Sequence, residues 1–146
     1  MTTNLVQFLR DRYDEEAALA ASGETWSAFD ESTQGTRRVD VDHSFERVVA
    51  CTRAWRGEHI ARHDPARTLR EIEAKRQVLK EYTKAAETME ELAVRRERLK
   101  ASGQDVFMTE MERASAIHKR DVLHGVLQIL ALPYSDHPAY RQEWRP

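Results

Sequence analysis

The sequence predicts an α-dominated α+β fold, in which a long antiparallel helical hairpin carries a small N-terminal β-sheet and a docked C-terminal tail. The stretch from Ala66 to Ala101 contains neither proline nor glycine and repeats apolar residues at helical spacing. Strand-forming residues concentrate instead between positions 23 and 52. A chain of 146 residues is expected to form a single domain, 1–146, around one core.

Residues 1–22 are predicted to form the first helix. Leu5, Phe8 and Tyr13 recur near helical spacing, and acidic residues cover the opposite side. Gly23 favours the end of this helix, because glycine readily adopts the left-handed conformation that terminates helices.

Residues 23–52 are predicted to form a small β region. The stretch Arg38–Asp42 alternates apolar and polar residues with a period of two, and Thr33–Thr36 is typical of a hairpin turn. Two strands alone are marginally stable in water, so this sheet is expected to pack against a helix. The three expected strands lie near 25–30, 37–42 and 46–52.

Residues 54–102 are predicted to form two helices that meet at Asp64 and Pro65. Asp64 is a favoured N-cap, because its carboxylate accepts hydrogen bonds from free amides of the first turn. Proline suits the first helical position, where its missing N–H costs nothing. The first helix is expected over Ala54–His63 and the second, the long helix, over Pro65–Ala101. Its buried stripe is expected to comprise Leu69, Ile72, Arg76, Leu79, Tyr82, Ala86, Met89, Leu92 and Leu99.

Residues 109–132 are predicted to form the return helix of the hairpin. Thr109 and Glu112 have the spacing of a capping box, and Pro133 ends the helix. The tail, 133–146, is rich in aromatic residues and is expected to dock rather than to be disordered. The core-facing side of the return helix is expected to comprise Met111, Ala114, Ile117, Val122, Val126, Ile129 and Leu130.

The composition excludes several classes of protein. No window approaches the ~18 apolar residues of a transmembrane helix, and the first residues lack the pattern of a secretory signal. A single cysteine, Cys51, excludes an internal disulfide and a cysteine-rich zinc site. The expected compartment is therefore the cytoplasm.

The net charge of −2 hides an asymmetry along the chain. Residues 11–46 hold ten acidic and three basic residues, whereas residues 47–102 hold fourteen basic and nine acidic ones. Segments of opposite charge can bind a partner of either sign or a second copy of the same chain. Ordinary salt-bridged, solvated helices give the same pattern.

Two motifs resemble a family of short, uncharacterised proteins from actinobacteria and their phages. The first is HIARHDPARTLREIEAKRQVL, from His59 to Leu79, and the second is LALPYSDHPAYRQEWRP, from Leu130 to Pro146. The resemblance implies no established activity. It alone suggests a phage or actinobacterial source.

The first motif also contains a candidate metal site. His59 and His63 are four residues apart, so on one helix they share a face, as zinc-binding pairs do. If the tail folds back near His59–Arg70, His137 joins them, with Asp64 or Asp136 as an oxygen ligand. The competing interpretation is that these residues cap and pack helix ends, since the pair lacks the glutamate of a metalloprotease motif.

Arg62, Arg67 and Arg70, together with Trp55, form a candidate binding surface. Arginine interleaved with tryptophan can stack on bases and neutralise phosphate. However, the isoelectric point near 6.3 lies far below the value above about 9 that is typical of nucleic-acid-binding modules. Nucleic acid is therefore the less favoured partner, and no membrane partner is expected.

The sequence favours a non-enzymatic interaction, accessory or regulatory protein without a cofactor. Its expected partner is a second copy of itself, in a homo-oligomer, or a host or phage protein, because the apolar stripe of the long helix exceeds what one return helix can cover. The alternative is a small zinc-binding protein or a metal-dependent hydrolase that uses His59, His63 and His137.

Overall fold

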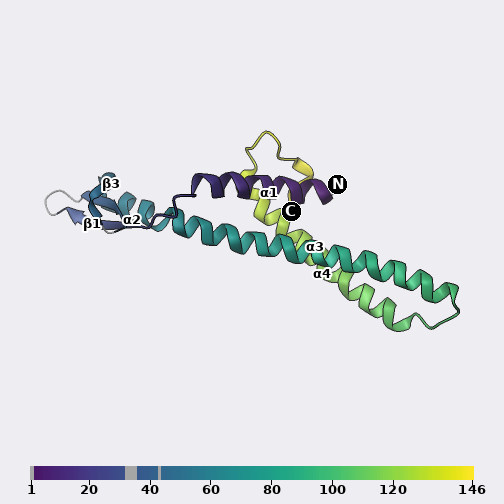
Figure 1. The fold of residues 1–146 in the computed structure, drawn as a ribbon. Coiled ribbons are helices and arrows are strands. Elements are labelled where there is room, and N and C mark those ends of the chain that lie inside the picture. Colours follow the sequence, from purple (N-terminus) through teal and green to yellow (C-terminus); the bar gives the residue numbers. More distant parts are fainter. Residues whose placement is uncertain (1, 32–35, 43) are drawn as a thin grey trace. The chain divides into compact units, whose positions relative to one another are not determined.

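The computed structural model confirms the predicted fold class (Figure 1). It describes the backbone of residues 2–31, 36–42 and 44–146, and the side chains of residues 5–29, 38–42 and 56–146.

The chain divides into two compact units. Unit 1 comprises residues 1–10 and 75–146, and unit 2 comprises residues 11–74. Helices α1 (Thr2–Leu19) and α3 (Pro65–Ala101) each contribute residues to both units. The organisation as one domain stays a prediction.

In unit 2, α1 ends close to its predicted boundary. After Leu19 the chain turns, and the amide of Gly23 donates a hydrogen bond to the carbonyl of Ala20 (3.0 Å). Gly23 has a φ of +63°, a left-handed conformation in which a side chain would be strained. The glycine therefore turns the chain from α1 toward the sheet.

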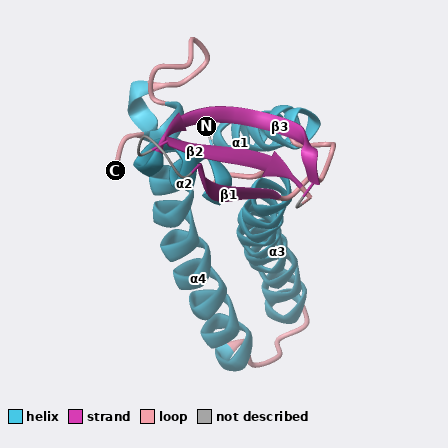
Figure 2. Cartoon of the chain, turned by 90° about the vertical axis from the view of Figure 1, so that its left-hand side faces the viewer, coloured by secondary structure: helices cyan, strands magenta, loops and turns pink. Residues whose placement is uncertain are grey.

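The sheet of unit 2 contains the three predicted strands, which are antiparallel and lie in the order β1-β2-β3. They are β1 (Trp26–Glu31), β2 (Thr36–Val41) and β3 (Ser44–Arg53). Helix α2 (Ala54–Arg62) contacts all three strands, which supplies the helix that so small a sheet needs (Figure 2). The predicted turn at Thr33–Thr36 falls largely on residues 32–35, which lie outside the described residues.

The pairing of β2 with β3 is irregular around Asp40. Val39, Asp40 and Val41 are all buried, although alternate residues of a strand face opposite sides. The buried Asp40 carboxylate accepts a hydrogen bond from Nε of Arg38. An ion pair thus compensates part of the cost of burying this charge.

In unit 1, α3 and α4 (Phe107–Ala131) form the predicted antiparallel hairpin (Figure 2). The end of α3 is a Schellman motif, in which the amide of Gln104 bonds to the carbonyl of Leu99 and that of Gly103 to Lys100. Gly103 has a φ of +68°, as this motif requires. The glycine that interrupts the sequence pattern is therefore the residue that reverses the chain.

The predicted capping box of the return helix is wrong. α4 begins at Phe107, and the side chain of Asp105 accepts a hydrogen bond from the Phe107 amide (2.9 Å). Thr109 therefore lies inside the first turn, where it is buried. Glu112 instead forms a long ion pair with Arg95 of α3 (3.8 Å).

Polar contacts tie the two helices of the hairpin along its length. Lys119 bonds to Glu81 (2.7 Å), and Arg96 forms an ion pair with Glu110. These bonds lower the pKa of both carboxyl groups, mainly because the cationic partner donates a hydrogen bond to each. Of the predicted stripe of α3, Leu79 and Tyr82 are buried in unit 1, and the rest of the stripe there is half-buried. The other buried side chains of the hairpin in this unit are Ala85, Thr109, Leu127 and Ala131.

The predicted core face of α4 is wrong. Met111, Ala114, Val122 and Ile129 are exposed, and Ile117, Val126 and Leu130 are only half-buried. The reason is that α4 carries apolar residues on two sides, and its contacts with α3 turn Thr109 and Leu127 inward instead.

The tail docks within unit 1, as predicted. It contains two short 3₁₀ helices, Leu132–Tyr134 and Gln142–Trp144. Phe8 of α1 meets four aromatic rings of the tail, and Trp144 is buried. This aromatic cluster comprises Phe8, Tyr134, His137, Tyr140 and Trp144.

None of the helices in the described part of the chain combines the length and the hydrophobicity that a membrane span requires.

Candidate functional site

The junction between α2 and α3 is organised by Asp64. Its Oδ1 accepts a hydrogen bond from the Arg67 amide (2.5 Å), and its carbonyl accepts one from the Thr68 amide (3.0 Å). Its Oδ2 lies 3.5 Å from the Trp26 amide, and the Ala66 amide bonds to the carbonyl of Glu24 (3.1 Å). Asp64 is thus the predicted N-cap, and the junction also binds the segment that leads into β1.

The two histidines of the junction lie side by side. The ring centroids of His59 and His63 are 4.5 Å apart, and both side chains are exposed. Two imidazoles on neighbouring helical turns can supply two nitrogen ligands to one metal ion. Among the residues that the structure describes, however, no group of three or more histidine, cysteine, aspartate or glutamate side chains is placed to hold a metal.

The third predicted ligand, His137, belongs to unit 1 and has contacts of its own there. Its Nδ1 accepts a hydrogen bond from the Ala139 amide (3.1 Å), and its ring packs against Phe8 with centroids 5.7 Å apart. Its observed contacts thus belong to the aromatic cluster. Its convergence with His59 and His63 stays a prediction, as does the contact of the tail with residues 59–70.

The predicted arginine surface is partly engaged within the chain. Arg67 donates from Nε to Glu71 (2.7 Å) and from Nη1 to the carbonyl of Arg62 (2.9 Å). Arg62 and Arg70 are exposed. The side chain of Trp55 lies outside the described residues, so its proposed stacking role stays a prediction.

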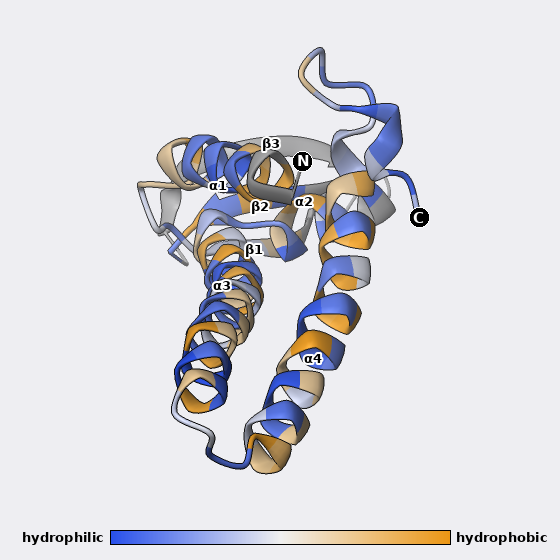
Figure 3. Cartoon of the chain, turned by 90° about the vertical axis from the view of Figure 1, so that its right-hand side faces the viewer, coloured by the Kyte–Doolittle hydropathy of each residue, from blue (hydrophilic) through white to orange (hydrophobic). Residues whose placement is uncertain are grey.

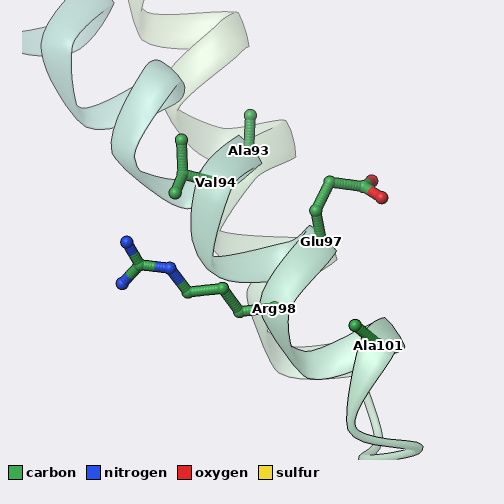
Figure 4. Close-up of a pocket in the computed structure, with 5 residues that line it drawn as sticks. All are labelled: Ala93, Val94, Glu97, Arg98 and Ala101. Carbon is green, nitrogen blue, oxygen red and sulfur yellow. The ribbon is translucent and has the colours of Figure 1, made fainter.

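Shallow hollows lie on the surface, one near the junction of α2 and α3 and another near the end of α3. One of 230 Å³ adjoins His63 and is lined mainly by apolar side chains, with Glu16 and Thr68 as further polar neighbours. A larger one, of 520 Å³, is lined by residues of α3 alone, from Ala93 to Ala101 (Figure 4). A single helix cannot enclose a ligand, so this hollow is a stretch of open helix surface and not a binding cavity.

Most of the exposed large apolar side chains of the described residues lie on α4, chiefly on the side that faces away from α3. Positions at alternating intervals of three and four residues share one side of a helix. On this side of α4, and at Leu132 just after it, they hold a series that is exposed except at the half-buried Gly125 and mostly apolar at both ends. Figure 3 shows hydrophobic residues distributed along the length of α4. This outward stripe comprises Met108, Met111, Ser115, His118, Val122, Gly125, Ile129 and Leu132.

Sequence reasoning missed the outward stripe because it assigned Met111, Val122 and Ile129 to the core. The signal was nevertheless present. Apolar residues occupy more of α4 than one face can bury, and the alternating spacing separates a second series from the inner one that contains Leu127.

Comparison with protein families identifies the group to which the chain belongs. Residues 2–146 match the family of unknown function DUF6221, and the chain is therefore a member of this family. No curated protein and no solved structure matched the chain. The expected membership of an uncharacterised family is confirmed, and the expected source stays a prediction.

Proposed function

We propose that this DUF6221 protein is a non-enzymatic interaction module, an accessory or regulatory protein that binds a protein partner through the outward stripe of its α3–α4 hairpin. The observation that carries the proposal is the exposure of Met108, Met111, Val122, Ile129 and Leu132 along one side of α4. We also propose a phage or actinobacterial source, because its motifs resemble proteins of that origin. A cytoplasmic role is part of the proposal, since the sequence is not expected to contain a membrane segment.

The size of the exposed apolar surface supports an interaction. The five residues and the adjacent Phe107 are 38–66% exposed. If a large apolar side chain presents roughly 200 Å² when fully exposed, they leave on the order of 600–700 Å² uncovered. The largest apolar patch on a typical monomer covers about 300–600 Å² and is often functional. Ser115 and His118 divide the exposed area here between the two ends of the stripe.

The experiment compares the full-length chain with an Ile129→Lys variant, each carrying the same tag, in capture from the native source. Ile129 is exposed, so the substitution is expected to leave the fold intact. Gln77→Lys, on the exposed side of α3, adds the same charge away from the stripe and is the control. We expect the wild type and the control, but not Ile129→Lys, to retain a bound protein. An untagged copy of this chain counts as such a protein. Equal retention by all three would contradict the proposal.

A second candidate function is metal binding at His59 and His63, favoured by the 4.5 Å separation of their rings. We propose zinc or another first-row metal, with further ligands from water or a bound molecule, which leaves the open coordination that a metal-dependent hydrolase needs.

The test for metal binding titrates untagged protein with Zn²⁺ by calorimetry and repeats the titration with His63→Ala. Stoichiometric binding that is lost in the variant is expected. The exposed His118, distant in sequence from the pair, supplies the His118→Ala control. Zinc uptake that is the same in the wild type and His63→Ala would exclude this site.

A further inference from the structure

We propose that the partner of the outward stripe is a second copy of this chain, whose α4 binds in the antiparallel direction about a two-fold axis that passes between His118 and Val122, at the level of residue 120. This inference rests on the proposed function and names its partner.

The spacing of the stripe is that of a coiled-coil seam. Its eight positions, from Met108 to Leu132, follow one another at intervals of three and four residues, which is the repeat that keeps one side of a helix facing a partner helix. The chain's own hairpin uses the other side of α4, where Leu127 and Ala131 are buried. Five of the eight positions hold apolar residues, and this side of α4 is not occupied by α3.

An antiparallel pairing about residue 120 matches large residues with large ones and small with small. Met108 meets Leu132 of the other copy, and Met111 meets Ile129. Ser115 meets Gly125, and His118 meets Val122. A parallel pairing in register would instead place Gly125 against Gly125 and His118 against His118, which leaves a gap at one level and two imidazoles together at another.

Gly125 is the residue that the isolated chain does not explain. It lies inside α4 with an ordinary helical conformation, where glycine is less favourable than alanine. A Cβ atom added there would meet no other atom within 4 Å, so no contact within the chain requires its absence. The close approach of a helix from another molecule does require a small residue at this position.

The exposed area is sufficient for such a contact. The exposed apolar area of one copy, roughly 600–700 Å² as estimated above, is on the order of the ~800 Å² that each partner buries in a standard interface. The pairing would cover this area on both copies. An isologous contact of this kind closes a dimer and leaves no further stripe exposed for growth.

The charges beside the stripe do not drive the pairing. Lys119 and Asp121 would each lie near their own counterparts, but both are already paired within the chain, with Glu81 (2.7 Å) and Arg120 (2.5 Å). The contact is therefore apolar in character, and salt is expected to maintain the dimer rather than to dissociate it.

The first experiment measures the mass of the untagged full-length chain by light scattering after size exclusion, over a range of concentrations and at low and high salt. We expect about twice the monomer mass of 17.0 kDa for the wild type and the Gln77→Lys control, and the monomer mass for Ile129→Lys. A wild type that remains monomeric at the highest concentration, or an Ile129→Lys variant that remains dimeric, would overturn the proposal.

The second experiment tests the direction of pairing by a charge exchange between two chains. Met111→Lys and Ile129→Glu are each expected to be monomeric alone. Mixed, they are expected to form a heterodimer, because the antiparallel register places the new lysine beside the new glutamate. Failure to associate on mixing, or association of either variant alone, would overturn the antiparallel register.

Gly125→Leu separates pairing from folding. Leucine favours a helix more than glycine does, so the variant is expected to unfold at a higher temperature than monomeric Ile129→Lys. It is also expected to be monomeric, because the larger side chain prevents the close approach at Ser115. A dimeric Gly125→Leu protein would contradict the pairing.

The two proposals fail differently. If the wild type is monomeric but still captures another protein through Ile129, the interaction module stands and the self-pairing falls. If the wild type and Ile129→Lys are both dimeric, the outward stripe is not the interface and the self-pairing falls; if all three proteins of the capture experiment also retain a bound protein equally, the interaction module falls with it.

Discussion

Asp64 shows how one side chain can stabilise a junction of several segments. It caps α3 through the Arg67 amide, and its second oxygen reaches the Trp26 amide at the start of β1. Asp64→Ala removes both acceptors and is expected to lower the free energy of unfolding by about 1 kcal/mol or more, as for other lost N-caps. Asp64→Asn keeps one oxygen and is expected to lose less.

Denaturant unfolding followed by circular dichroism measures this difference. Asp136→Ala, an exposed aspartate of the tail, is the control and is expected to change stability little. An Asp64→Ala protein as stable as this control would show that the capping bonds contribute nothing.

Tyr13 links a single residue to alkaline stability. Burial raises the pKa of Tyr13 from 10.0 to about 12. The unfolded chain therefore loses the phenol proton at a lower pH than the folded chain does. The contribution of Tyr13 to stability is complete below pH 10 and is lost as the pH rises from 10 toward 12.

Tyr13→Phe is expected to reduce this alkaline loss. The unfolding temperature, measured from about pH 9 up to the folded-state pKa of about 12, would reveal the difference. Tyr140→Phe controls for the removal of a hydroxyl elsewhere. Equal slopes for the wild type and Tyr13→Phe would contradict the assignment.

At the scale of the elements, the hairpin is expected to weaken in acid. The ion pairs with Lys119 and Arg96 lower the pKa of Glu81 and Glu110 below their ordinary 4.5. Their contribution to stability is therefore present above pH 4.5 and is lost as the pH falls from 4.5 through the lower folded-state values. Because the pairs are solvent-exposed, the effect is modest and is screened by salt.

The double variant Glu81→Gln/Glu110→Gln is expected to lose less stability on acidification than the wild type. Glu87→Gln/Glu91→Gln alters two exposed glutamates of α3 and is the control. The comparison is made by thermal unfolding at several pH values from about 5 downward. This range starts just above 4.5, the ordinary pKa of these carboxyl groups. A double variant as acid-sensitive as the wild type would show that other carboxylates dominate.

At the scale of the whole molecule, self-association links stability to concentration. A dimer that forms only from folded chains raises the unfolding temperature as the protein concentration rises. The wild type is expected to show this dependence, and Ile129→Lys is expected to show none. Scanning calorimetry over a hundredfold range of concentration makes the measurement, and a constant unfolding temperature for the wild type would speak against the dimer.

The sequence predicts most elements of this fold because their signals are local. Pro65 begins α3 and Gly103 ends it, so both boundaries of the long helix can be read from neighbouring residues. The identity of the buried face of α4 cannot, because α4 is apolar on two sides and the packing of α3 against Leu127 and Ala131 depends on residues distant in sequence.

The candidate sites divide in the same way. The capping role of Asp64 follows from the adjacent proline, whereas its bond to Trp26 joins segments that are distant in sequence. Likewise, the contact of His137 with Phe8 depends on where the tail docks. The spacing of His59 and His63 does predict their proximity, because His63 directly follows α2 and its amide bonds back to Ile60, which continues the turn of the helix.

The contact between Phe8 and Trp144, with ring centroids 4.9 Å apart, has a consequence for the order of folding. Residues so far apart in sequence meet at a high cost in loop-closure entropy unless the chain between them is already ordered. The hairpin instead joins Arg96 to Glu110, only 14 residues apart. Unit 1 is therefore expected to nucleate at the hairpin and to close its aromatic cluster last, so that the cluster sets the rate at which the unit unfolds more than the rate at which it folds.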